Sequence, residues 1–368
     1  MELTCKKDWP DARKRLEAFW HNEGIGRPFI SVYAPNGYVA KDISMPKTFR
    51  EKVLDFEYRI LAEEEWIKSV YFGGEAVPCV WPDFSPDFTS ACIGGDLEVA
   101  ERTPDTQIMG SVWAKHVIDD WNTDLNNIEF NPESIWMKRG IEYTELAVQM
   151  GKGKYLVESL DVDGGMDTAA GLRGAEKLCM DILDCPENVG ALLDRIRKGN
   201  YEVVDRLFSS VRDSQGGMVN TYKIYAPGKT YNMRSDFSYM IDPDLFRSLV
   251  LPYMVEESNS AEYIIFHTHT EDAEKNREKR LKYLDVILDI PRIHAVEWSC
   301  GGQSLETRIT GMRRIIEKGK MVIAQAAASD VLEISKLLGK NDAQRVMFIT
   351  YTANENDAQD LIRTLERV

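Results

Sequence analysis

The chain places acidic and imidazole side chains directly after several short apolar runs. Asp83, Asp236, His267 and Glu297 occupy four such positions. Carboxyl and imidazole groups donate or accept protons near neutral pH when their surroundings adjust their pKa values. We therefore predict that these four residues are catalytic. For Asp83, which is flanked by Pro82 and Ser85-Pro86, a purely structural role in a turn is the alternative.

A possible metal site lies in the same part of the sequence. His267 and His269 are two positions apart in a chain with only five histidines. Residues i and i+2 of an extended strand project to the same side, so both imidazoles can converge on one ion or one substrate group. Glu297 and Cys300 follow a later apolar run, and catalytic zinc takes three ligands of these types plus an open position. We predict zinc bound by His267 and Glu297, with Cys300 or His269 as the third ligand. The alternative is a hydrogen-bonded buried histidine, a surface glutamate and a small buried cysteine.

Polar residues before a predicted helix at 243–258 form another candidate. Asp242 directly precedes Pro243, so it is the natural N-cap of that helix. Arg234 and Asp236 are not needed for capping and are free to serve a site. We predict that Arg234 binds substrate.

Apolar runs that read as strands alternate with segments of helical period. Eight strand candidates lie near residues 29, 77, 156, 221, 264, 295, 322 and 348. Strands separated by helices indicate βαβ units and a parallel sheet. We predict a closed (β/α)8 TIM barrel, because closure removes both sheet edges and brings the carboxyl ends of all strands to one mouth. An open doubly wound sheet is the alternative, although no Gly-x-Gly-x-x-Gly turn follows the first strand.

We expect residues 1–368 to form a single barrel domain. An amphipathic helix over 8–22 is predicted to extend it at the N-terminus, with Trp9, Leu16, Phe19 and Trp20 on one side. The stretch near 95–130 is irregular and rich in Trp, Asp and Asn, which indicates an insertion.

Charge and cysteine usage exclude several classes of protein. The 60 acidic residues exceed the 45 basic ones and give a net charge of -15, which disfavours binding to nucleic acid or to an anionic membrane. The six cysteines form no Cys-x-x-Cys pair and do not resemble a secreted disulfide scaffold. Residues 1–20 lack an apolar signal core. We expect a cytoplasmic enzyme with a small-molecule substrate, and a homodimer is one possible assembly.

Several of these segments resemble the uroporphyrinogen decarboxylase superfamily. Residues 235–253 are similar to the family's aspartate-containing loop and the helix that follows it, and 172–187 resemble another family stretch. Strand ends at His267 and Glu297 match those that carry a histidine and an acidic residue. The resemblance spans about residues 25–365. It implies a TIM barrel and an enzyme.

The resemblance implies a methyltransferase that moves a methyl group between a small substrate and a thiol or a corrinoid. A decarboxylase or lyase that acts on a small carboxylic acid without a cofactor is the first alternative. A non-catalytic barrel that binds a ligand is the second. The chain contains no Asp-x-His-x-x-Gly cobalamin-binding sequence, so a corrinoid would arrive on a separate partner protein.

The chain departs from the family pattern at two places. Uroporphyrinogen decarboxylases carry arginines in the loop after the first strand, whereas the loop from Tyr33 to Tyr38 has none; porphyrinogen decarboxylation is therefore not expected. Zinc methyltransferases of the superfamily carry His-x-Cys where this chain has His-x-His. Glu297 resembles the acidic zinc ligand of the related methionine synthases. We predict Tyr33, Tyr38 and Trp298 as further substrate-binding residues.

Overall fold

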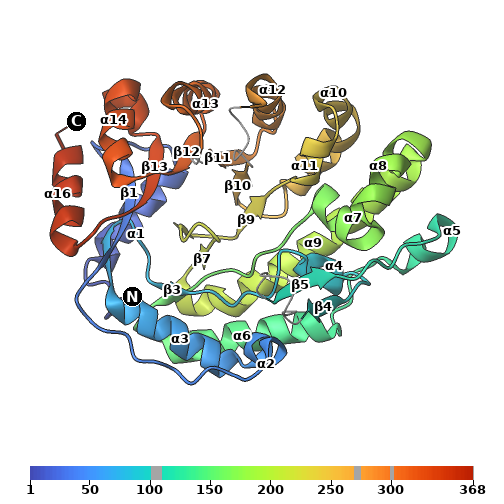
Figure 1. Cartoon of the computed structure of the whole chain (residues 1–368), viewed down its shortest axis with the longest axis horizontal. Coiled ribbons are helices and arrows are strands. Elements are labelled where there is room, and N and C mark those ends of the chain that lie inside the picture. Colours follow the sequence, from blue (N-terminus) through green and yellow to red (C-terminus); the bar gives the residue numbers. More distant parts are fainter. Residues whose placement is uncertain (101–109, 269–274, 299–301, 368) are drawn as a thin grey trace.

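The computed structural model describes residues 1–100, 110–268, 275–298 and 302–367 (Figure 1). Its largest sheet has seven strands in the order β2-β1-β13-β12-β11-β10-β9. All neighbours in it are parallel except β2, which runs antiparallel to β1. The strands are β1 (Phe29–Pro35), β2 (Val70–Gly74), β9 (Thr230–Met233), β10 (Tyr263–His267), β11 (Ile293–Glu297), β12 (Met321–Gln325) and β13 (Val346–Tyr351).

Shorter strands complete the sheet structure. β3 (Cys79–Val80) pairs in parallel with β6 (Leu156–Val157), and β7 (Met218–Val219) forms an antiparallel hairpin with β8 (Tyr225–Ala226). A parallel bridge from Glu158 to Val219 links β6 to β7. β4 (Leu97–Ala100) and β5 (Ser111–Ala114) form a separate hairpin inside the stretch predicted to be an insertion.

The closed barrel predicted from sequence is confirmed only as an α/β fold with a parallel central sheet. Within the described residues, no strand ladder joins β9 to β7 or β1 to β3. The edge of β1 is taken by the antiparallel strand β2, and β7 turns back on itself through β8. Strands lie at or next to seven of the predicted positions, whereas residue 221 falls in the turn between β7 and β8. β2 and β9 are further strands that the sequence pattern did not reveal.

Side chains from both sets of strands nevertheless share one buried interior. A single cluster contains Phe29 of β1, Leu156 of β6, Val219 of β7, Ile265 of β10 and Ala295 of β11. The alternate residues of the strands pack outward into a second, larger cluster beneath the helices. This two-sided burial is the pattern expected for parallel strands.

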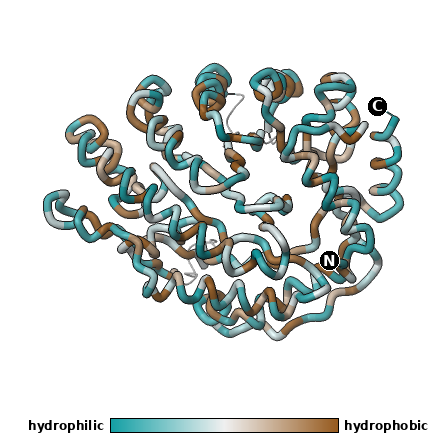
Figure 2. The backbone as a smooth tube through the Cα atoms, turned by 180° about the vertical axis from the view of Figure 1, so that it is seen from behind, coloured by the Kyte–Doolittle hydropathy of each residue, from teal (hydrophilic) through white to brown (hydrophobic). Residues whose placement is uncertain are grey.

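The helices cover the outer side of the strands (Figure 1). In Figure 2 the outer helices alternate between hydrophobic and hydrophilic residues, as expected for helices with one face on a sheet. Among the described helices, none combines the length and apolarity that a bilayer crossing requires. The helices are α1 (Trp9–Trp20), α2 (Phe49–Leu54), α3 (Phe56–Ser69), α4 (Phe88–Cys92), α5 (Trp121–Asp124), α6 (Ile135–Gly151), α7 (Gly165–Arg173), α8 (Ala175–Asp184), α9 (Pro186–Gln215), α10 (Pro243–Leu245), α11 (Leu251–Glu257), α12 (Arg277–Leu288), α13 (Leu305–Glu317), α14 (Ala328–Leu338), α15 (Lys340–Ala343) and α16 (Glu355–Leu365).

Helix α1 packs against the amino ends of the strands. Its four predicted apolar residues are buried in the interior cluster. The Trp20 indole nitrogen donates to the carbonyl oxygen of Tyr225 at 2.8 Å, and the Trp9 ring meets the Tyr225 ring edge-on at 5.3 Å. The helix therefore closes the interior at the end opposite the predicted mouth.

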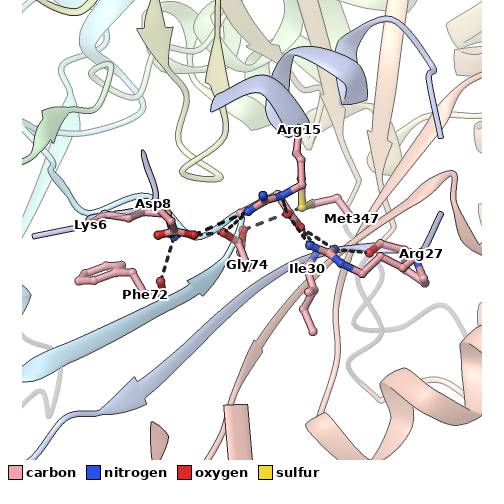
Figure 3. A network of polar contacts seen from close by, with 11 residues as sticks. Lys6, Asp8, Arg15, Arg27, Ile30, Phe72, Gly74 and Met347 are labelled. Atoms are coloured by element: carbon pink, nitrogen blue, oxygen red, sulfur yellow. Dashed lines mark hydrogen bonds and ion pairs between the residues drawn. The ribbon is translucent and has the colours of Figure 1, made fainter. Parts of the chain in front are cut away.

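A buried ionic network fixes this helix to the sheet (Figure 3). Glu75 is completely buried just after β2 and accepts hydrogen bonds from Arg27 at 2.8 and 3.0 Å and from the Ile30 backbone at 2.7 Å. Arg15 of α1 also donates to it. Burial alone would raise the pKa of Glu75, but Arg27 and Arg15 outweigh burial and hold that pKa below its usual value. The carboxylate is thus ionised at neutral pH.

We expect Glu75→Gln to destabilise the fold strongly, because it leaves Arg27 buried without its counter-charge. Breaking a buried ion pair costs about 3–5 kcal/mol. Urea unfolding at pH 7 measures this loss. The control is Glu306→Gln, which removes a largely exposed partner of Arg277 and should change the free energy of unfolding by less than about 1 kcal/mol.

The same network has a defined pH dependence. Because the pKa of Glu75 is lowered in the folded state, its contribution is present above the unfolded-state pKa and disappears as the pH falls through the folded-state value. The difference between wild type and Glu75→Gln should therefore shrink in acid. Equal stabilities of the two proteins at pH 7 would contradict this role.

Candidate functional site

A register shift brings the predicted histidine and glutamate together. His267 ends β10, Glu297 ends β11, and the two residues are direct partners in the ladder. The register shifts by one residue between Ile264 and Ile265, where the Ile264 amide donates to His294 Nδ1 at 3.2 Å. Ile265 and Ala295 face the interior cluster, so the side chains two positions later also face inward. His267 Nδ1 lies 3.0 Å from Glu297 Oε2.

Tyr222 approaches the same imidazole nitrogen. Its hydroxyl oxygen lies 2.6 Å from His267 Nδ1. Burial and the Glu297 carboxylate raise the pKa of Tyr222 well above its usual value, so the phenol stays protonated. One Nδ1 atom cannot at once donate to Glu297 and accept from Tyr222, so the two contacts correspond to two proton positions. With the hydrogen on Nδ1 shared with Glu297, Nε2 can accept a proton; with Nδ1 accepting from Tyr222, Nε2 carries the hydrogen and donates a hydrogen bond.

Glu297 is held rigidly behind the histidine. Its side chain is almost completely buried, whereas His267 remains partly exposed. The Thr268 hydroxyl donates to the Glu297 carbonyl oxygen at 2.6 Å and tethers the two strand ends. A buried carboxylate that accepts a hydrogen bond from a partly exposed imidazole fixes the orientation of the ring.

Arg234, directly after β9, is enclosed by carboxylates. It forms ion pairs with Asp161 and, at 2.7 Å, with Asp163, both in the segment after β6. Asp167 accepts hydrogen bonds from the backbone amides of Asp236 and Phe237 at 2.9 and 2.8 Å. Burial, and then the neighbouring Asp236, raises the pKa of Asp167 to about 6. The loop after β9 is therefore fixed to the segment after β6.

Asp83 lies beside this group, in the segment after β3. Burial and the nearby Asp161 carboxylate raise the pKa of Asp83 to about 7, while Arg59 and Arg234 oppose the rise. Its Oδ1 atom is buried and has no hydrogen-bond partner among the described residues. Glu63 of α3 accepts a hydrogen bond from the Trp81 amide at 2.8 Å, and burial raises its pKa to about 7 as well. Such groups can exchange protons near neutral pH.

A further ion pair joins Lys223, in the turn between β7 and β8, to Glu158, directly after β6. Lys223 donates to Glu158 at 3.0 Å, and the Cys79 thiol donates to the same carboxylate at 3.4 Å. Lys223 has a φ of 57°, which is unusual for a residue other than glycine or asparagine. Tyr33 is buried and stacks on Tyr351 at 5.3 Å; burial raises the pKa of its hydroxyl. The positive φ of Lys223 is a strained backbone conformation, and such strain is concentrated at functional sites.

The structure places the predicted site residues in different surroundings. Arg234 and Asp236 follow β9, and His267 and Glu297 are the last residues of the adjoining strands β10 and β11, whereas Asp83 follows β3. Two of the predicted substrate-binding residues have other surroundings: Tyr38 is exposed and donates to Glu65, and Trp298 is buried and packs against Gly311 of α13. His269 and Cys300 lie outside the described residues.

Sequence reasoning missed several residues of the site. Glu158, Asp161 and Asp163 follow β6, which lies at the strand predicted near 156, so the rule applied to other strand ends would have found them. Tyr222 and Lys223 lie in the β7–β8 hairpin. The sequence was read there as one continuous strand over 218–225, which hid the turn.

The zinc prediction is not tested by the described residues. Among residues 1–100, 110–268, 275–298 and 302–367, no three side chains of the metal-binding types form a group that could hold an ion. His267 and Glu297 contact each other rather than converging on an open centre. A third ligand would have to come from His269 or Cys300.

Comparison with known proteins shows the fold. No protein-family model matches the chain, and no curated protein sequence matches it. A solved structure described as a methyltransferase from Methanosarcina mazei is similar, with a TM-score of 0.60 and 10% sequence identity. The match covers 97% of this chain and 98% of the other, so the likeness concerns the whole architecture.

We expect Asp83→Asn to stabilise the protein at alkaline pH. An acid whose folded-state pKa is raised costs no stability below its unfolded-state pKa, and the cost grows as the pH rises to the folded-state value of about 7. Removing the charge should therefore raise the free energy of unfolding at pH 8 by on the order of 2 kcal/mol.

Chemical denaturation at pH 4.5 and pH 8 measures this effect. The gain should be much smaller at pH 4.5. The exposed Asp184→Asn is the matched control and should be neutral at both pH values. A loss of stability for Asp83→Asn at pH 8 would instead indicate that Asp83 serves as a structural turn residue.

Proposed function

We propose that the protein is a methyltransferase that moves a methyl group from a small methylated compound to a thiol or to a corrinoid on a partner protein. The contact of His267 with both Glu297 and Tyr222, at neighbouring strand ends, carries this proposal. The overall likeness to a methyltransferase structure supports it at the level of the fold. The site would lie at the mouth of a barrel-like arrangement of the strands.

In the proposed reaction with a thiol acceptor, the methyl group passes from the donor to the thiol sulfur. A proton passes from the thiol, through His267, to the leaving atom of the donor. A thiol acceptor loses its proton to His267 Nε2 as its sulfur attacks the methyl carbon. The bond from carbon to the leaving atom breaks, and the imidazolium returns the proton to that atom. Glu297 accepts from Nδ1 while Nε2 takes up and returns the proton, and Tyr222 would stabilise the other neutral form, in which Nδ1 carries no hydrogen. Asp83 and Asp236 would orient the substrate or move protons.

The charges at the site favour a neutral or cationic methyl donor. Arg234 is neutralised by Asp161 and Asp163, and Lys223 by Glu158. Asp83 adds a further acid. A carboxylate substrate would have to displace one of these acids from its buried cation, which is costly. The same pairing disfavours the decarboxylase alternative, in which Arg234 would bind the carboxylate of the substrate.

Zinc and a corrinoid partner remain predictions from the sequence. When bound, zinc would activate a thiol by lowering its pKa. His267 and Glu297 would contribute to that site with His269 or Cys300. The proton transfers proposed above do not depend on it.

Methyl transfer can be tested with CD3-labelled amines, thioethers and methyl ethers as donors and a small thiol or cob(I)alamin as acceptor. Mass spectrometry should detect the labelled acceptor. We expect His267→Gln and Glu297→Gln to lower kcat by about 10²–10⁴-fold, the range for loss of general acid–base catalysis.

The exposed His21→Gln is the control and should keep full activity. Release of carbon dioxide from small acids, with no methyl transfer, would favour the lyase. Ligand binding without turnover would favour a non-catalytic protein. Metal analysis of protein purified without chelators, for wild type and His267→Gln, decides the role of zinc separately.

A further inference from the structure

A small polar cavity lies where the two sets of strands meet without a ladder. It measures about 10 Å³ and is lined by residues that follow β6, by the start of the β7–β8 hairpin and by β9. Three of its lining residues, Asn220, Thr230 and Asn232, are buried with exposures of 2%, 2% and 7%. A void of roughly 10–15 Å³ is enough for one water molecule. We propose that this cavity is a binding site for a single structural water that joins β7 to β9.

Three buried polar atoms at the cavity lack partners among the described residues. They are Asn220 Nδ2, Thr230 Oγ1 and Asn232 Oδ1. Thr230 and Asn232 are two positions apart on β9 and thus project to the same side. Leaving a buried donor or acceptor unsatisfied costs about 1–3 kcal/mol. Three such atoms at one cavity are therefore unfavourable unless a hydrogen-bonding molecule occupies it.

Neighbouring contacts fix the orientation of both amides. Asn220 Oδ1 accepts from the backbone amides of Tyr222 and Ile224 at 3.0 and 3.2 Å, which turns Nδ2 toward the cavity. Asn232 Nδ2 donates to the Thr221 hydroxyl, which turns Oδ1 toward the cavity. The cavity thus presents one donor, one acceptor and one hydroxyl that can act as either.

This combination identifies the ligand as water rather than a cation. A cation could be bound by Asn232 Oδ1 and Thr230 Oγ1, but the Asn220 NH2 group would repel it. Water accepts from Asn220 and donates to Asn232, and its second hydrogen or lone pair can serve Thr230. Buried waters typically make about three such bonds.

The proposed water would lie between two elements that carry residues of the candidate site. The turn between β7 and β8 begins at Asn220 and carries Tyr222 and Lys223. Strand β9 leads into Arg234. Within the described residues, a side-chain bond from Asn232 to Thr221 connects these elements, but no strand ladder does. The water would add a second connection and keep Tyr222 in position against His267.

A crystal structure of the full chain at about 1.5 Å resolution or better tests the proposal directly. We expect a density peak about 2.7–3.2 Å from Asn220 Nδ2, Asn232 Oδ1 and Thr230 Oγ1. An empty cavity, or direct contact between the two amides, would overturn the proposal. A peak with the short, oxygen-only coordination of a metal ion would overturn it as well.

Thermal unfolding of two isosteric variants gives an independent test. Thr230→Val removes one partner of the water and should lower Tm by about 1–3 °C. The control is Thr350→Val, because Thr350 is similarly buried and its Oγ1 atom also lacks a partner among the described residues, but it lies on β13 and does not line the cavity. That variant should show no loss. A Thr230→Val protein as stable as Thr350→Val would contradict the water site.

Discussion

The candidate site depends on a single irregularity in the ladder between β10 and β11. Without the register shift beside His294, the residue opposite His267 would be Val296 and not Glu297. Because side chains alternate between the two faces of a sheet, the Glu297 side chain would then project to the face opposite the imidazole. The Ile264 amide, which loses a regular ladder partner at the shift, is satisfied by the His294 ring. The irregularity is therefore stabilised locally, and it sets the geometry of His267 and Glu297.

Side chains rather than strand ladders hold the two halves of the mouth together. On one side, Arg234 after β9 pairs with Asp161 and Asp163 after β6. Closer to the interior, Asn232 contacts Thr221. Within the described residues, the site thus combines the seven-stranded sheet with a half that is attached to it through ionic and amide contacts.

Much of the architecture could be predicted from periodicity. Apolar strands and amphipathic helices leave strong patterns, and the rule that polar residues gather after parallel strands identified His267 and Glu297. The pairing at the edge of the sheet could not be predicted, because the pattern did not reveal β2, the antiparallel partner of β1. The strand-end rule could have found Asp161 and Asp163, but not their pairing with Arg234, since ion pairs between distant segments depend on tertiary contacts that spacing does not encode.

The β7–β8 hairpin shows a different limit of sequence reasoning. Lys223 has a left-handed backbone conformation, and a glycine or asparagine at this position would have indicated a turn in the sequence. With lysine there, the segment 218–225 reads as one strand. The residue that is least suited to the local backbone is also the one that neutralises Glu158, so the conflict between local preference and tertiary contact coincides with the site.

Helix α1 restricts the side from which small molecules can reach His267. Its tryptophans cover the amino ends of the strands, so a compound coming from that side would have to displace them and the interior cluster to reach His267. In the proposed methyl transfer, donor, acceptor and both products would therefore use the opposite side, at the carboxyl ends of the strands. A bulky carrier protein docked on that side would block the departure of a small product, which favours an order of events in which the small molecule enters first and the carrier leaves first.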